Sequence, residues 1–236
     1  RRLAGSSSAT AALAFGGYIS TDQTATEEFS NSVPIANTWQ TGGNLNTGRT
    51  IMGNAGDSNT SALGFGGFQP PGVTNTVLTE SYNGTSWTEV NDLNTARQID
   101  GTGTQTAALG FGGSSTNPSP PPGTLYVALT ETWNGTNWTE VNDLNVAKNY
   151  VGAGGTTTSA IAAGGGPSTK NDTEIWNGTN WTETHNLNTG RYQLAGTGAS
   201  STDAIVFGGL TPSVTAVTET WNGSSWTEVA DLSTAR

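Results

Sequence analysis

Carboxylates are the side chains of this 236-residue sequence that could do acid–base chemistry, and they recur at regular intervals. One set is Glu80, Glu131, Glu174 and Glu219, and a second is Glu89, Glu140, Glu183 and Glu228. Aspartates recur in the same way at Asp92, Asp143 and Asp231. Catalytic acid and base residues form a unique pair, whereas these carboxylates occur once per repeat. We therefore interpret them as structural or solvent-facing, and we find no Asp-rich spacing typical of a calcium loop.

The other residue types that carry chemistry are scarce. His185 is the only histidine, which excludes a histidine-rich metal site, and no Gly-x-Ser-x-Gly motif accompanies it. The sequence has no cysteine, so it offers no thiolate nucleophile, no disulfide and no cysteine metal ligand. We expect no metal and no cofactor, and we expect that the protein is not an enzyme.

The charge balance excludes two classes of partner. The formal net charge is −10, and no lysine or arginine cluster exists beyond Arg1 and Arg2. Nucleic acids and anionic membranes need basic patches, so we expect no nucleic-acid partner. No apolar run approaches the ~20 residues of a membrane span, so we expect no membrane insertion. The aromatic residues recur at fixed places and can fill a core, which argues against disorder.

Three markers recur five times in the same order, which indicates an internal repeat. The first is a diglycine that usually follows a phenylalanine, at Gly16-Gly17, Gly66-Gly67, Gly112-Gly113, Gly164-Gly165 and Gly208-Gly209. The second is a tryptophan, at Trp39, Trp87, Trp138, Trp181 and Trp226. The third is a basic residue, at Arg49, Arg97, Lys148, Arg191 and Arg236. The mean spacing of the diglycines is 48 residues.

Each repeat is predicted to form four short strands. In the third repeat these are residues 98–103, 107–111, 129–133 and 138–141, and the last two are joined by the tight turn at Asn134-Gly135. Equivalent Asn-Gly turns occur at Asn83, Asn177 and Asn222. These asparagines also match the glycosylation sequon, although turn formation explains them without it. A period of 40 to 50 residues with four strands per unit is typical of propeller blades.

The fold class predicted is all-β, a five-bladed β-propeller of four-stranded blades with 18 to 20 strands and no long helix. We expect one domain over residues 1–236, with blades at about 1–48, 49–96, 97–147, 148–190 and 191–236. We expect the ring to close edge to edge without strand exchange, and the alternative is a segment of a longer array.

The segments ALGFGG, TETWNGTNWTEV and DLNTAR resemble the pattern of the kelch repeat: a strand that ends in Gly-Gly, a tryptophan after a tight turn, and a Leu-x-x-x-Arg segment. The resemblance covers nearly the whole chain and implies that each first strand lines a central channel. The turn is shorter than usual, and the first repeat has Phe29 in place of a tryptophan. Kelch enzymes similar to galactose oxidase need a Tyr–Cys crosslink and several histidines, which this chain lacks. Repeats that contain the sequence Trp-Asn-Gly-Thr are similar to those of phage and marine bacterial surface proteins.

The repeated residues are expected to build the scaffold. Tryptophans are large enough to fill the wedge between neighbouring blades, namely Trp87, Trp138, Trp181 and Trp226. The basic residues can bond loop carbonyls or pair with a repeated glutamate across a blade interface, namely Arg49, Arg97 and Arg191. Each diglycine is expected where the backbone turns sharply and a Cβ would clash.

The loops after the diglycines break the repeat, and they carry the candidate binding residues Tyr18, Phe68 and Tyr126. We expect a non-catalytic recognition module on an extracellular or virion surface, such as a phage tail fibre, which binds a glycan or a protein through these loops. The alternative from another class is an architectural spacer or decoration domain of a larger assembly. A propeller enzyme of unknown chemistry is the third hypothesis.

Overall fold

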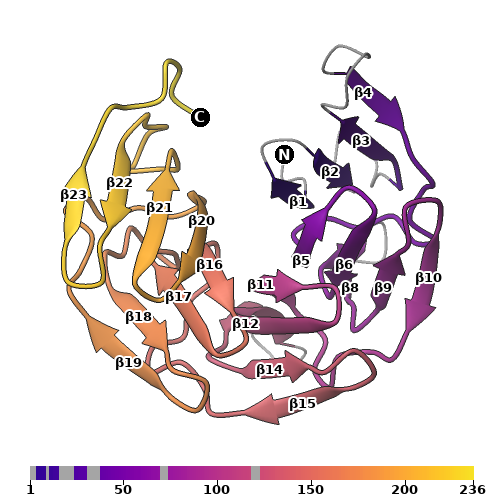
Figure 1. The fold of residues 1–236 in the computed structure, drawn as a ribbon. Helices are drawn as coiled ribbons and strands as arrows, with labels where there is room; N and C mark the ends of the chain where they lie inside the picture. The colour runs from indigo at the N-terminus through magenta and orange to yellow at the C-terminus, as the bar shows by residue number, and fades with distance from the viewer. Residues whose placement is uncertain (1–3, 9–10, 16–23, 31–37, 70–73, 118–122) are drawn as a thin grey trace.

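Five antiparallel sheets stand side by side around a common centre in a computed structural model of the protein (Figure 1). The structure describes residues 4–8, 11–15, 24–30, 38–69, 74–117 and 123–236. Twenty strands build the sheets, and three further strands lie in loops, so the described total of 23 exceeds the expected 18 to 20. The predicted all-β propeller of five blades is confirmed. None of the described residues forms a helix that could cross a membrane.

The first two blades each contain four strands. Blade 1 consists of β1 (Ala4–Ser8), β2 (Ala11–Phe15), β3 (Thr26–Ser30) and β4 (Thr38–Thr41). Blade 2 consists of β5 (Gly53–Ser58), β6 (Ser61–Phe65), β9 (Thr79–Tyr82) and β10 (Trp87–Val90). Between β6 and β9 lie the two-residue strands β7 (Phe68–Gln69) and β8 (Thr74–Asn75), which pair with each other.

The last three blades follow the same order. Blade 3 consists of β11 (Gln98–Thr104), β12 (Ala107–Asn117), β14 (Thr130–Trp133) and β15 (Trp138–Val141), with β13 (Gly123–Tyr126) added beside β12. Blade 4 consists of β16 (Gly152–Thr156), β17 (Ser159–Ala163), β18 (Thr173–Trp176) and β19 (Trp181–Thr184). Blade 5 consists of β20 (Ala195–Ser200), β21 (Asp203–Phe207), β22 (Thr218–Trp221) and β23 (Trp226–Glu228).

The outer hairpin of each complete repeat is set by its Asn-Gly turn. In blade 3 the Asn134 side-chain oxygen accepts hydrogen bonds from the backbone N–H groups of Thr136 and Asn137, each at 2.9 Å. Gly135 has a φ of 90°, which suits a residue without a Cβ. The turn therefore fixes the register in which Trp133 faces Trp138.

The hydrophobic core is divided into four clusters, one at each interface between consecutive blades. In the interface between blades 2 and 3, Leu63 and Phe65 of blade 2 pack with Ile99, Trp133 and Trp138 of blade 3. Because each cluster draws on both neighbours, a blade buries its apolar faces only when another blade stands on each side.

Tryptophans of the fourth strands fill these interfaces. Trp138 is 6% exposed, and its ring centroid lies 4.7 Å from that of Phe65 in the preceding blade. Its indole N–H donates to the hydroxyl of Thr79 in that blade at 3.0 Å. The same bond to the preceding blade is made by Trp87, Trp181 and Trp226. The indole therefore supplies both apolar bulk and a satisfied polar contact.

A buried basic residue at the end of each of the first four blades reaches into the next blade. Arg97 donates to the Glu131 carboxylate at 2.5 Å and to the Gly112 carbonyl at 3.1 Å. Equivalent pairs join Arg49 to Glu80, Lys148 to Glu174 and Arg191 to Glu219. Both alternatives for the arginines, carbonyl bonding and glutamate pairing, are thus present in the structure.

These ion pairs are nearly inaccessible to water. The side chains of Arg97 and Glu131 are 0% and 1% exposed. Burial lowers the pKa of Arg49 and Arg191 below the ordinary value, and the attraction of their glutamates opposes that decrease. Each charge depends on its partner, because an unpaired charge at such a site is costly.

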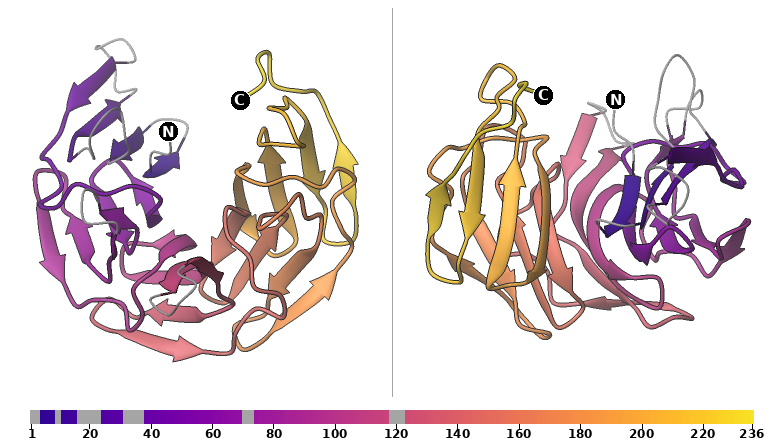
Figure 2. Two further views of the ribbon diagram at one scale, coloured as in Figure 1. Left: turned by 180° about the vertical axis from the view of Figure 1, so that it is seen from behind. Right: turned by 45° about the horizontal axis from the view of Figure 1, so that its top comes forward.

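The expected ring closure is wrong for this structure. The inner strands lie side by side in the order β1, β5, β11, β16 and β20, and both face-on views show an open gap between blade 5 and blade 1 (Figures 1 and 2). The described side chains at the two ends agree, because Glu27 of blade 1 and Arg236 after blade 5 are exposed. The repeat pattern predicts which faces meet, but it does not fix the angle between successive blades.

Tyr82 gives the interface between blades 1 and 2 a pH dependence. Its hydroxyl donates to the Glu28 carboxylate, and burial, with this bond and the nearby charge, raises its pKa from 10 to about 12. The unfolded chain then loses the phenol proton before the folded chain does, so the contribution is complete below pH 10 and is lost as the pH rises toward 12.

Urea unfolding of the wild type and of Tyr82→Phe at pH 9 and pH 11.5 tests this expectation. Because the variant has no phenol at this position, the free energy of unfolding should fall less between the two pH values in the variant than in the wild type. Equal decreases in the two proteins would contradict the assignment.

Candidate functional site: the diglycine face

We call the side of the ring that carries the loops after the diglycines the diglycine face. The first glycine of each described pair has a φ between 59° and 69°, as at Gly112, and the second has a φ between 100° and 112°, as at Gly113. A Cβ on Gly113 would lie 1.9 Å from the Gln98 carbonyl oxygen. Only glycine therefore lets the second strand end here and pass close to the first.

The basic residues also fix these loops through their backbone. The Arg97 carbonyl accepts a hydrogen bond from Gly67 N–H of its own blade at 2.9 Å, while its side chain donates to Gly112 of the next blade. The same backbone bond joins Lys148 to Gly113 at 2.7 Å and Arg191 to Gly165 at 2.9 Å. The scaffold thus holds the start of each loop in place and leaves the rest of the loop free to differ.

The loop of blade 2 begins at the predicted binding residue Phe68. Phe68 is half-buried, and its backbone exchanges hydrogen bonds with Thr50 at 2.8 and 3.0 Å. It also pairs with Asn75 in the short ladder between β7 and β8. Phe68 is therefore fixed by backbone bonds on both sides instead of lying on a free loop.

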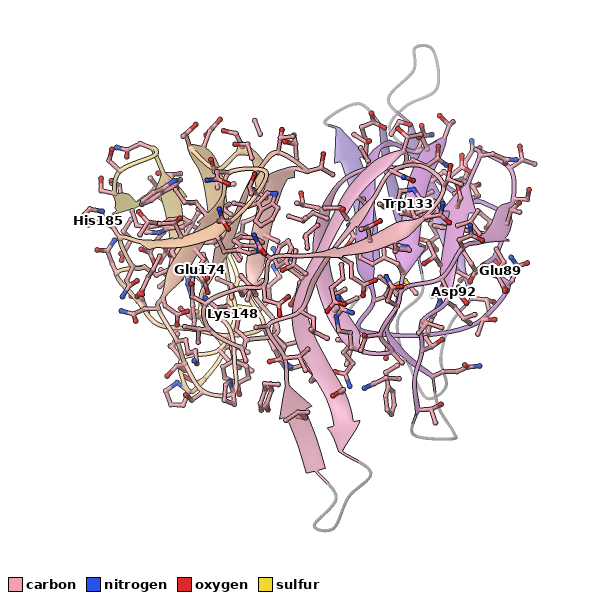
Figure 3. The ribbon with its side chains drawn as sticks, turned by 90° about the horizontal axis from the view of Figure 1, so that it is seen from below. Glu89, Asp92, Trp133, Lys148, Glu174 and His185 are labelled. Atoms are coloured by element: carbon pink, nitrogen blue, oxygen red, sulfur yellow. The ribbon has the colours of Figure 1, made fainter. Side chains whose placement is uncertain are left out.

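The loop of blade 3 departs furthest from the repeat. β12 continues six residues past Phe111, and β13 pairs with the extension from Ser114 to Asn117. The resulting hairpin projects away from the body of the ring (Figure 3). It carries Tyr126, which is half-buried, and Leu125, which is 53% exposed. The sequence predicted a loop after the diglycine of blade 3, but part of this segment is a two-stranded extension.

These two loops meet. The Asn75 side-chain amide of blade 2 donates to the Ser114 carbonyl of blade 3 at 3.0 Å. Because Phe68 pairs with Asn75 and Ser114 pairs with Tyr126, two backbone pairings and this side-chain hydrogen bond link the two aromatic residues. The third predicted residue, Tyr18, lies outside the described residues.

A cavity of about 220 Å³ lies at the mouth of the central channel on the same face. Its lining includes Ile51, Met52, Asn54, Asp100, Val151 and Leu194. Ile51 directly follows Thr50, the residue bonded to Phe68, so the mouth and the loop of blade 2 are adjacent. We call this cavity the channel mouth.

Two polar residues of the channel mouth break the repeat. Asp100 pairs in register with Phe111, and the residues at the equivalent place in blades 2, 4 and 5 are Gly53, Gly152 and Ala195. Asn54 is one residue further along β5, where the other described blades have glycine or alanine. The sequence reasoning missed both residues, although a polar side chain in a run of small ones was the available signal.

Strained backbone lies beside the channel mouth, because Ile51 lines it and Tyr150 and Gln193 each precede a lining residue. Ile51, Tyr150 and Gln193 have φ values of 54°, 58° and 56°, which side chains rarely adopt. Each lies two residues after the basic residue that ends the preceding blade, and blade 3 has one residue fewer between that basic residue and its inner strand. The strained residue accommodates that extra position. Strained backbone is found most often at functional sites.

The recurring carboxylates are either bonded within the scaffold or exposed to solvent. Glu80, Glu131, Glu174 and Glu219 are buried in ion pairs, and the second glutamate set is exposed on the fourth strands. The Asp92 carboxylate accepts the Thr79 backbone N–H at 3.0 Å, and Asp143 and Asp231 do the same for Thr130 and Thr218. His185 is exposed at the outer edge of the ring (Figure 3). The described part of the chain contains no cluster of three potential metal ligands.

The face thus combines two half-buried aromatic residues, an exposed leucine on the β12–β13 hairpin and a small cavity lined by both polar and apolar residues. Such a surface can stack against a ligand and accept hydrogen bonds from it. No known protein-family model matches this chain, and no curated protein matches it significantly.

Proposed function

We propose that this chain is a non-catalytic recognition module of kelch-like blades on an extracellular or virion surface. It binds a glycan or a protein through the diglycine face. A phage tail fibre is one setting that suits a rigid, acidic, cysteine-free module of this kind.

The observation that carries the proposal is that the described strands outside the four-stranded repeat lie on the diglycine face and not on the opposite face. The three extra strands of the described chain, β7, β8 and β13, all lie in loops after diglycines, whereas on the opposite face blades 2 to 5 repeat the same Asn-Gly turn. Packing fixes the repeated positions, so binding specificity is free to develop where the repeat is broken.

The chemistry of the face suits a polyhydroxylated ligand or a polar peptide. Phe68 and Tyr126 offer apolar ring surface held by backbone pairing, which reduces the entropy lost on binding. The oxygens of Asn54 and Asp100 at the channel mouth are of a type that accepts hydrogen bonds from hydroxyl or amide groups. Aromatic anchors beside a few oriented polar groups are common in recognition sites.

The same residues argue against glycoside hydrolysis. That reaction uses two carboxyl groups on opposite sides of the scissile bond. Asp100 is the one carboxylate among the residues that line the described channel mouth. An enzyme would therefore need a second carboxylate from elsewhere, while recognition needs none.

An architectural role is the second candidate, and one observation favours it. The face of blade 5 toward the gap is only partly covered, with Phe207 and Leu232 half-exposed. Such a surface fits a chain that is one part of a larger assembly.

A glycan array probed with the wild type, Phe68→Ala and Tyr126→Ala tests the recognition proposal. The wild type should bind a restricted group of glycans, and each substitution should weaken binding by about 30-fold or more, since a hot-spot aromatic is worth about 2 kcal/mol. If the array shows no bound glycan, intact cells probed with the same variants test for a protein ligand.

The control variant is Asn134→Asp in the hairpin on the opposite face. It should bind as the wild type does, because Asn134 is exposed and lies away from the diglycine face. Full binding by both aromatic variants, with loss in Asn134→Asp, would move the site to the outer rim and overturn the proposal.

A further inference from the structure

At every interface between consecutive blades, the earlier blade contributes one recurring set of residues and the later blade contributes another. On the side of a blade toward its successor, which we call the trailing face, blade 2 presents Leu63, Phe65, Thr79, Leu93 and Arg97, all between 0% and 4% exposed. We call the opposite side of a blade, toward its predecessor, the leading face. The leading face of blade 3 contributes Trp138 and Glu131 to this interface. The trailing face thus supplies a hydroxyl acceptor and a cation, and the leading face supplies an indole N–H and a carboxylate.

Blade 5 carries a complete trailing face against which no described blade packs. Pairing register and repeat position identify its members as Ile205, Phe207, Thr218, Leu232 and Arg236. Ile205, Phe207 and Leu232 are only partly buried, although the equivalent leucines and phenylalanines of blades 1 to 3 are nearly inaccessible.

The polar members of this face also lack their usual partners. In each interior interface the threonine hydroxyl accepts an indole N–H, as Thr79 does from Trp138 at 3.0 Å. No described tryptophan donates to Thr218. The Arg236 side chain is exposed and pairs with no described residue, whereas Arg49, Arg97, Lys148 and Arg191 are 0% exposed.

On its leading face, blade 1 has a glutamate that no described cation pairs with, unlike its equivalents in the other blades. Glu27 pairs in register with Ala14, at the position that Glu80 occupies opposite Gly64. Glu27 is exposed and has no described cation beside it, but its four equivalents are buried at 0% or 1% exposure. The two faces that border the gap therefore carry opposite charges that no described residue pairs with.

We propose that the trailing face of blade 5 binds a further blade of the same repeat, placed after blade 5 as blade 5 is placed after blade 4. The occupant presents a fourth-strand tryptophan to Thr218 and a third-strand glutamate to Arg236, and it packs its apolar residues on Ile205, Phe207 and Leu232. The proposal follows from continuity with four interfaces of identical chemistry and from charge complementarity at both borders of the gap.

The test appends a copy of residues 98–148 directly after Arg236, because blade 3 follows Arg97 in the same way. This blade brings copies of Glu131 and Trp138. We expect the melting temperature of the extended chain to exceed that of the 236-residue chain by roughly 5 °C or more. Amide exchange in β21 should also become slower. A matched extension whose copy carries both Glu131→Ala and Trp138→Ala should give neither effect.

The variant Arg236→Ala distinguishes an appended blade that packs on the trailing face of blade 5 from one that is only covalently attached to it. It should leave the melting temperature of the 236-residue chain unchanged and lower that of the extended chain. If the extension does not raise the melting temperature, and Arg236→Ala changes the melting temperature of neither chain, the proposal is overturned.

Two other occupants give different results in the 236-residue chain, and either would overturn the proposal. If a second copy occupies the face, sedimentation will show an oligomer that Arg236→Ala and Glu27→Ala each dissociate. If blade 1 of the same chain closes the ring, the chain will be monomeric and both substitutions will destabilise it non-additively.

Discussion

Trp138→Ala is expected to lower the free energy of unfolding by about 3–5 kcal/mol, the range for removal of a large buried aromatic side chain. Trp138 is 6% exposed and fills the space between Phe65 and Trp133. The substitution leaves a cavity at the interface and also removes the donor to Thr79. Urea unfolding monitored by circular dichroism and by tryptophan fluorescence measures the loss and tests whether the blades unfold together.

Two further variants separate the contributions. Trp138→Phe keeps an aromatic ring but loses the indole N–H, so it should cost less than the alanine substitution. Glu140→Ala lies on the same strand with its side chain exposed, and it should change stability by less than about 0.5 kcal/mol. An unchanged melting temperature in Trp138→Ala would show that the tryptophan does not hold the blades together.

Arg97→Met is expected to lower the free energy of unfolding by about 3–5 kcal/mol, because it leaves the Glu131 carboxylate buried without its cation. The Gly112 carbonyl loses a donor at the same time. The change retains the length and apolar character of the side chain, so the loss reports on charge and hydrogen bonding more than on packing.

The double variant Arg97→Met/Glu131→Gln should recover much of this loss. Glutamine has no charge, and its amide oxygen can still accept the hydrogen bonds that Asn94 now donates to Glu131 at 2.8 Å. Arg236→Met is the matched control, since it changes the same repeat position without a described partner, and it should be nearly neutral. A double variant no more stable than Arg97→Met would contradict this account of the ion pair.

The scaffold was predictable because its determinants are local and repeated. The tight Asn134-Gly135 turn fixes the outer hairpin, and the diglycine at Gly112-Gly113 ends the second strand, so blade 3 could be placed from residue types alone. Five repetitions of the same order then imply the propeller.

The site was only partly predictable, because its features depend on small differences between repeats. Asp100 reaches the channel mouth through a one-residue difference in register between blade 3 and its neighbours. The β12–β13 hairpin pairs residues of low β-propensity, among them Ser114, Ser115 and Asn117, which indicated a loop. Ring closure failed as a prediction because the angle between blades depends on the packing of whole interfaces.

Hydrogen exchange of the intact chain, with and without the glycan that binds most strongly on the array, tests whether the diglycine face is the binding site. We expect slower exchange on binding in residues 66–69, 74–77 and 112–117 and at the channel mouth, with no change in the Asn83, Asn134, Asn177 and Asn222 turns. Protection confined to those turns, with none on the diglycine face, would contradict this expectation.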